Sequence, residues 1–229
     1  MSEELIEHAL VVADTLPNTT SRARYITVIA KELALAGDPD RAQRLIGSIT
    51  SPPLLQKAMG VAASAAAHAG HLVQAERIAR TISDASRRAK ALAAVARYMV
   101  GFGALDEAER ISQSITEPIQ RARTLSEIAH GHAGSGDTAR AAEIAASIPE
   151  PAERSRALTT IALDSNADHA TALVAQALCA GHWSICLPAL VRLAPEVVTA
   201  IGAESLRVHD QEDAAAAADG LSRGDRSDR

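Results

Sequence analysis

Four glycines recur at equal spacing along this chain, and they constrain its fold more than any other feature. They are Gly37, Gly70, Gly103 and Gly136, and each step is 33 residues. Three further columns keep the same step: alanine at 30, 63, 96 and 129, alanine at 42, 75, 108 and 141, and isoleucine at 49, 82, 115 and 148. A fixed period of this size is typical of stacked helical repeats, in which each unit buries its apolar face against its neighbours.

Each unit is predicted to contain two helices. In the first full unit, the two apolar stripes at helical spacing comprise Ile26, Ile29, Ala30 and Leu33, and then Ala42, Leu45, Ile46 and Ile49. Between the stripes, Gly37 lets the chain turn past a helix end, Asp38 is a suitable N-cap, and Pro39 is harmless in a first helical turn. Pro52 and Pro53 prevent the second helix from continuing, and Pro118 and Pro151 recur at nearly the same phase.

The repeats are predicted to span residues 2–165. Residues 2–16 match a second helix, since Ala9, Val12 and Leu16 fall in its columns, and a fifth first helix is expected near 151–165. Helices at 167–180, 184–193 and 195–207 should close the C-terminal end. We therefore expect a helical repeat domain over 1–208, with closing helices in 166–208, and a disordered tail over 209–229, where the sequence is acidic and Ala-rich and then rich in Gly, Ser, Arg and Asp.

Composition limits the cellular location and the classes of binding partner that are expected for this chain. Aromatic residues make up only 2% of the chain and hydrophobic residues 47%, so the core must be built from Ala, Leu, Ile and Val. The net charge of −5 argues against a nucleic-acid partner, because nucleic-acid binders usually carry a basic excess. Two cysteines, an acidic start and the lack of a long uncharged apolar run indicate a cytoplasmic protein without a membrane partner.

Catalytic and metal-binding patterns are weak. The chain has no phosphate-binding loop, no Gly-rich dinucleotide turn and no zinc-protease motif. His130 and His132 are two residues apart and should face different ways on a helix, and His68 and His71 flank a helix end. Cys179, His182 and Cys186 lack a fourth ligand at standard zinc spacing, which favours buried cysteine in a helical cap. We expect no enzymatic activity, no cofactor and no metal.

The strongest candidate for function is a column of cations in the first helices. Its members are 33 residues apart: Arg24, Lys57, Lys90, Arg123 and Arg156. Arg24 lies opposite the apolar stripe at 100° per residue. Lys31 shares this outer face, and Arg97 and His130 repeat its position, so these eight residues are the candidate partner-binding set. A second column, Arg22, Arg88, Arg121 and Arg154, lies nearer the apolar side and is predicted to be structural.

The columns resemble those of the tetratricopeptide repeat family. In the first unit the matching positions are Ile26, Ile29, Ala30, Leu33, Ala42 and Ile46, although aliphatic residues occupy the family's aromatic positions and the period is 33 instead of 34. The resemblance covers residues 2–165. It implies an all-α, right-handed α–α superhelix, or solenoid, that binds peptides or partner proteins in a concave groove lined by first helices.

Three functions compete. The first is a scaffold whose basic column binds an acidic or carboxylate-bearing segment of another protein, with the small residues Thr27, Gly60, Ala93, Ser126 and Thr159 leaving room for the ligand backbone. The second is an oligomerisation or regulatory module that acts through the solenoid ends, including a homo-oligomer through the N-terminal end. The third is nucleic-acid binding by helical repeats, which the acidic charge and the shortage of stacking aromatics oppose. The column could also be a solvated face with ion pairs to Glu76, Glu109 or neighbouring acids.

Overall fold

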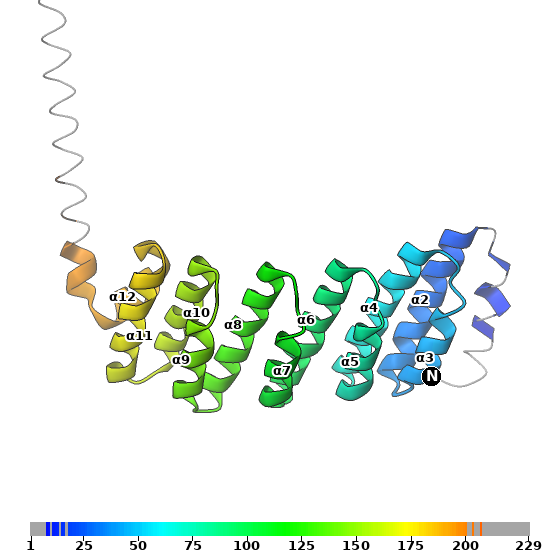
Figure 1. Cartoon of the computed structure of the whole chain (residues 1–229), viewed down its shortest axis with the longest axis horizontal. Helices are drawn as coiled ribbons and strands as arrows, with labels where there is room; N and C mark the ends of the chain where they lie inside the picture. The colour runs from blue at the N-terminus through cyan, green and yellow to red at the C-terminus, as the bar shows by residue number, and fades with distance from the viewer. Residues whose placement is uncertain are drawn as a thin grey trace, which may run out of the picture.

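The computed structural model describes residues 8–9, 11–13, 15–16, 18–200, 203 and 207, with only the backbone at 167 and 168. Every regular element in this described part is helical, which confirms the all-α class. The helices form an elongated row in which long and short helices alternate along the chain (Figure 1). Among the described helices, none combines the length and the apolar character that crossing a bilayer requires.

The helix starts follow the period of the sequence. The first helices are α2 (Thr19–Leu35), α4 (Pro52–His68), α6 (Ala85–Gly101), α8 (Pro118–Gly134) and α10 (Pro151–Asp164). The second helices are α3 (Pro39–Ile46), α5 (Leu72–Arg80), α7 (Leu105–Ser112) and α9 (Thr138–Ala146). Successive members of each set begin 33 residues apart, and the first helices from α2 to α8 have 17 residues each.

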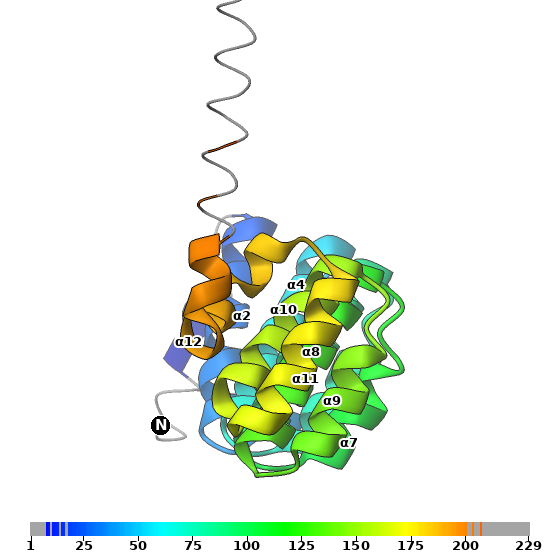
Figure 2. The same ribbon diagram turned by 90° about the vertical axis from the view of Figure 1, so that its left-hand side faces the viewer.

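The first helices pack side by side in one layer, and the second helices form another. Each first helix contacts the next, from α2 with α4 through α8 with α10, and each also contacts the second helix that follows it. Figure 2, a view along the row, shows α7 and α9 to one side of α8 and α10. The alanine column at 30, 63, 96, 129 and 162 is fully buried. Alanine has no side chain beyond Cβ, so the helices can approach closely.

The repeated glycines end the first helices with one shared motif. The φ angles of Gly37, Gly70, Gly103 and Gly136 are +94°, +84°, +77° and +93°. At the end of α2, the N–H of Asp38 donates to the carbonyl of Leu33 at 3.0 Å, and the N–H of Gly37 donates to that of Ala34 at 3.3 Å. This is the Schellman pattern, in which a left-handed residue satisfies carbonyls that the helix leaves unpaired. The same two bonds close α4, α6 and α8.

The C-terminal end differs in part from the prediction. Helix α11 (Ala167–Ala180) has the predicted bounds, but the helix expected over 184–193 is split into a 3₁₀ turn, η1 (Trp183–Cys186), and α12 (Leu187–Leu193). Pro188 lies in the first turn of α12. Because proline has no backbone N–H, it cannot donate the hydrogen bond that would continue one helix from η1 into α12. Residues 195–200 are helical, as are residues 203 and 207.

The N-terminal end is described only in fragments. Residues 8–9, 11–13 and 15 are helical, and Ala13 is 2% exposed. The predicted tail, 209–229, lies outside the described residues, as does about half of the leading helix predicted over 2–16.

Candidate functional site

All eight candidate cations are exposed on first helices. The structure places Arg24 and Lys31 on α2, Lys57 on α4, Lys90 and Arg97 on α6, Arg123 and His130 on α8, and Arg156 on α10. Each lies away from the buried stripe of its helix, as the 100° helical step predicts. Their exposure is thus explained by the sequence, while their grouping depends on how the helices pack.

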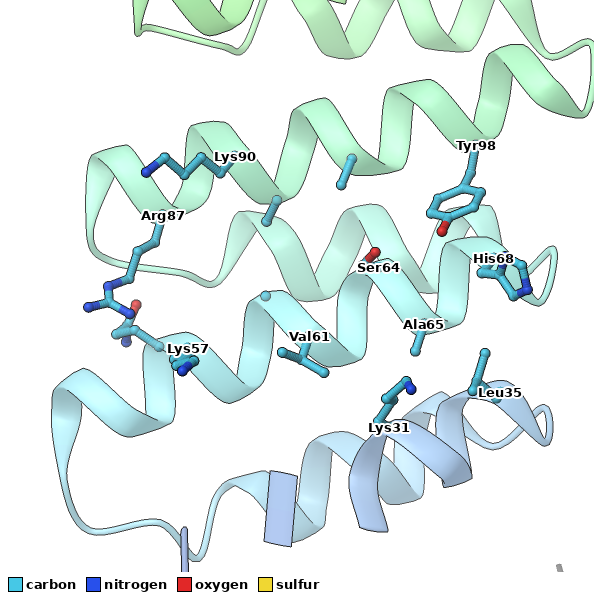
Figure 3. Close-up of a pocket in the computed structure, with 14 residues that line it drawn as sticks. Lys31, Leu35, Lys57, Val61, Ser64, Ala65, His68, Arg87, Lys90 and Tyr98 are labelled. Carbon is cyan, nitrogen blue, oxygen red and sulfur yellow. The ribbon is translucent and has the colours of Figure 1, made fainter. Parts of the chain in front are cut away.

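One groove brings three of the eight together. It has a volume of about 580 Å³ and is lined only by α2, α4 and α6 (Figure 3). The lining residues are Lys31, Leu35, Gln56, Lys57, Gly60, Val61, Ser64, Ala65, His68, Arg87, Lys90, Ala91, Ala94 and Tyr98. We call this the α4 groove, because α4 forms its floor and the other two helices form its walls. Its position on the outer face of the first-helix layer leaves it open to a ligand.

The α4 groove carries four cations and no carboxylate among its lining residues. Within the described part of the chain, Lys57, Arg87 and Lys90 have no ion-pair partner within 4.0 Å. Lys31 is 3.9 Å from Oε1 of Glu32 on its own helix, where both side chains are about half exposed. Gln56 serves the neighbouring loop, since its Oε1 accepts from the N–H of Ser83 at 2.7 Å. The groove therefore has unneutralised positive charge beside a largely apolar floor.

A second, smaller groove lies between α6 and α8. It has a volume of about 320 Å³ and is lined by Lys90, Ala93, Arg97, Gln120, Arg123, Thr124 and Glu127. Lys90 belongs to both grooves, so the two are adjacent. Here Glu127 lies 4.0 Å from Nε of Arg97. Burial raises the pKa of Glu127, and the charge of Arg97 opposes the rise. This second groove is therefore partly neutralised by its own carboxylate.

The remaining candidates lie outside the linings of both grooves. Arg156 pairs with Glu153 on its own helix, at 3.4 Å, and Nδ1 of His130 lies 3.5 Å from Asp164. Arg24 is exposed on α2. Among the small residues expected to flank a ligand, Thr159 is buried, 5% exposed, with its hydroxyl 3.7 Å from Sγ of Cys186. That expectation was wrong because η1 packs against α10 there.

The acidic residues Glu76 and Glu109 do not neutralise the cation column. Glu76 binds Arg110 and Arg80, and Glu109 binds Arg140, so their arginine partners belong to second helices. The predicted pairing of the column with these two glutamates is therefore wrong, whereas the predicted pairing with a neighbouring acid holds for Arg156, which contacts Glu153. The reason is geometric: the second-helix layer lies on the other side of the first-helix stripe. In contrast, the structural role predicted for Arg88 is confirmed, since its Nη1 donates to the carbonyl of Ile82 at 2.9 Å.

The two histidines of α8 have separate environments, as predicted. His130 is exposed, whereas His132 is buried, with 6% of its surface exposed. Nε2 of His132 lies 2.9 Å from Oε1 of Glu109, and the same carboxylate accepts from Nη2 of Arg140 at 2.6 Å. His132 thus adds to the polar contacts between α7, α8 and α9.

The three soft ligands near the C-terminus are not brought together. Cys186 is buried beside the hydroxyls of Ser155 and Thr159, while Cys179 is exposed and His182 contacts Ser184. Over the residues with described side chains, no group of three or more His, Cys, Asp or Glu is arranged to hold a metal ion.

The repeated columns of the sequence do not identify several residues of the α4 groove, above all Arg87, His68 and Tyr98. Arg87 lies three residues before Lys90, so both share one face of α6. The equivalent positions in neighbouring units are Leu54 and Gln120, and those of Tyr98 are Ala65 and Gly131. Because the residue types at these positions do not repeat, a search for repeated columns does not find them. The i, i+3 spacing of Arg87 and Lys90 is the sequence feature that indicates a shared helix face.

Neither a protein-family model, nor a curated protein, nor a solved structure matches the chain, so the assignment of a function depends on the residues described above.

Proposed function

We propose that this chain is a tetratricopeptide-like α-solenoid, a right-handed superhelix of 33-residue helix pairs, and a non-enzymatic scaffold that binds an acidic segment of a partner protein. The observation that carries the proposal is the α4 groove. It combines Lys31, Lys57, Arg87 and Lys90 with an apolar floor and has no carboxylate in its lining. Lys90 connects it to the second groove, so a longer acidic segment can continue toward Arg123.

The physical basis is charge complementarity together with burial. Exposed charge pairs are individually weak, typically under about 1 kcal/mol. Several of them on one ligand act together, and they direct the choice of partner and the rate of association more than the final affinity. Val61 and Ala65 of the floor and Ala94 of one wall supply apolar surface that an acidic segment can cover, at roughly 25 cal/mol per Å².

The proposal is tested with a random 12-residue peptide library selected on the purified protein. We expect the selected peptides to be enriched in Asp and Glu. The affinity of these peptides should fall as salt rises, because exposed charges are screened over about 8 Å at physiological ionic strength. A triple variant, Lys57→Glu, Lys90→Glu and Arg123→Glu, should lose these peptides while keeping its helical circular dichroism.

Arg44→Glu is the matched control for the single variant Lys90→Glu. It makes the same change of charge at an exposed position on α3, outside both grooves. Lys90→Glu should weaken binding and Arg44→Glu should not. Equal effects would mean that only net charge matters, and selection of peptides without acidic enrichment would remove the groove as the binding site.

The alternative, action through the ends of the row, is supported by apolar residues near the C-terminal end. Leu178, Trp183, Val191 and Val197 are 38%, 43%, 55% and 42% exposed. Exposed apolar surface of this kind is typical of association sites when it is contiguous. Sedimentation over a wide concentration range distinguishes the two functions, since contacts between ends raise the mass with concentration and a peptide-binding groove does not. The N-terminal route to a homo-oligomer falls on residues outside the described part.

A further inference from the structure

The two ends of the α4 groove have different chemistry. At one end are Lys57, Arg87 and Lys90, which come from the first two turns of α4 and α6 (Figure 3). At the other end are His68 and Tyr98, whose rings meet edge to face with centroids 5.3 Å apart. Figure 3 shows the three cations grouped together and the two rings grouped at the opposite end. A ligand in this groove therefore meets three cations at one end and two rings at the other, with Lys31 of α2 beside Leu35, nearer the rings (Figure 3).

The floor between these ends is apolar apart from Ser64 (Figure 3). It is formed by Gly60, Val61 and Ala65 of α4, with Ala91 and Ala94 of α6 as one wall. A Cβ atom placed on Gly60 would meet no atom within 4 Å, so the space above it is open. Small side chains allow a ligand backbone to approach the helix closely. Leu35 on α2 extends the apolar surface near His68 (Figure 3).

The length of the α4 groove determines how far apart two ligand groups must be to reach both of its ends. Lys57 and His68 are eleven residues apart on α4, which corresponds to about 16 Å at 1.5 Å per residue. An extended chain rises about 3.3 Å per residue, so about five residues cover this distance. A ligand helix would need about eleven residues, and helices that short are marginal in water before they bind.

We propose that the α4 groove binds an extended peptide with two anchors, an acidic group at the Lys57–Arg87–Lys90 end and an apolar side chain at the His68–Tyr98 end, about five residues apart. The inference rests on the proposed function and adds to it the spacing and the second anchor. It also places the ligand along α4, whereas the column of cations taken alone predicts a ligand that crosses from helix to helix.

Synthetic peptides test the spacing. The probe has two glutamates, a Gly/Ser spacer of four residues and a leucine, so that the nearer glutamate and the leucine are five positions apart. Three controls are a peptide with alanine in place of leucine and peptides with spacers of no residues and of ten residues. We expect the four-residue spacer to bind about tenfold more tightly than the alanine peptide, which is the effect of partly burying one leucine side chain. The salt dependence of the two should be the same, because they carry equal charge.

Variants of the protein separate the two anchors. The Tyr98→Ala variant should bind the leucine peptide only as tightly as it binds the alanine peptide. The Lys90→Glu variant should bind both peptides more weakly than the unchanged protein does. Since Tyr98 also packs against the core, Gly60→Leu is a second test that does not disturb packing. Leucine at position 60 fills the open floor and should block the binding of both peptides. Because leucine has a higher helix propensity than glycine, the variant should keep α4 folded. Gly134→Leu is its matched control, because a Cβ there also meets no atom within 4 Å, on α8 outside the α4 groove.

The outcomes distinguish this inference from the proposed function. If all acidic peptides bind equally, whatever their spacer and apolar residue, the scaffold function stands and the two-anchor arrangement is wrong. If no acidic peptide binds, both fail. The chain's own segment 209–229 is acidic at Asp210, Glu212 and Asp213 and is the competing occupant. If deleting residues 209–229 abolishes self-association and the deleted segment binds the groove better than the probe, a second copy is the ligand and the proposal is overturned.

Discussion

Arg110 in α7 binds Glu76 in α5 through two parallel hydrogen bonds, from Nη1 to Oε1 at 2.8 Å and from Nη2 to Oε2 at 2.7 Å. Arg80 also contacts this carboxylate, at 2.8 Å. Similar pairs join the other neighbouring second helices, Asp40 with Arg77 and Glu109 with Arg140. Charge in the second-helix layer is thus arranged in pairs between units. Among the residues that the structure describes, Lys57, Arg87 and Lys90 in the first-helix layer have no such partners.

Replacing Glu76 by glutamine should reduce stability in a pH-dependent way. The hydrogen bonds from Arg110 lower the pKa of Glu76, although burial opposes this. The stabilisation is therefore present above the pKa of the unfolded chain, about 4.3, and is lost as the pH falls through the lower folded value. At pH 7 we expect a loss of at most about 1 kcal/mol, since Arg110 is half exposed. Urea unfolding at pH 7 and pH 3 measures the difference in unfolding free energy between the unchanged protein and the variant. A difference that is equal at the two pH values would contradict the ionic role of Glu76.

Gly103→Ala should destabilise the end of α6. Its φ of +77° is costly for any residue with a Cβ atom, while the added methyl would meet nothing within 4 Å. The expected loss, about 1–2 kcal/mol, therefore comes from the backbone alone. Gly60→Ala is the control, since Gly60 lies inside α4 and alanine there should add about 0.5–1 kcal/mol. Thermal melts of both variants should move in opposite directions, and a parallel shift would disprove the backbone explanation.

Gly131→Ala should destabilise by a different mechanism. A Cβ at this position would lie 2.7 Å from Cγ1 of Val100 and 2.8 Å from Cδ2 of Leu105. Helix α8 must then shift or the neighbours must move, which typically costs about 1–3 kcal/mol in a packed interior. Adding Val100→Ala to this variant should recover part of the loss, because it removes one of the clashing atoms. Chemical denaturation of the single and double variants provides the measurement, and no recovery would indicate a cause other than the clash.

The triple variant Lys57→Glu, Lys90→Glu and Arg123→Glu should melt within a few degrees of the unchanged protein. These side chains are exposed and have no ion pairs among the described residues. Surface changes of this kind usually alter stability by no more than about 0.5 kcal/mol each. Differential scanning calorimetry measures the melting temperature. Unfolding of the variant would show that the column has a structural role, which would withdraw it as a binding surface.

Most of the helix boundaries could be predicted from sequence because local chemistry determines them. Gly37 and its equivalents are needed wherever φ is positive, and they mark the ends of the first helices. Pro52, Pro118 and Pro151 were expected to stop the second helices, and the structure shows that each also begins a first helix. The exposure of Arg24 and the other column members follows from helical periodicity alone.

The division of the helix predicted over 184–193 and the burial of Thr159 could not be predicted in the same way, because the repeat ends there. The 3₁₀ turn at Trp183–Cys186 packs on α10 and covers Thr159, although the column of small residues predicts an open position. The disorder of the tail over 209–229 and the association of the N-terminal end remain predictions.

The sequence by itself determined which residues face inward and where most of the repeat helices begin and end, since 33-residue spacing, alanine and isoleucine columns and left-handed glycines act within a single unit. Only the tertiary structure decided which exposed cations share a site. Lys31, Lys57, Arg87 and Lys90 come from three helices, and their distances depend on how α2, α4 and α6 pack. Tyr98 and His68 meet for the same reason. A repeat pattern encodes what all units have in common, whereas the groove is defined by residues that differ from one unit to the next.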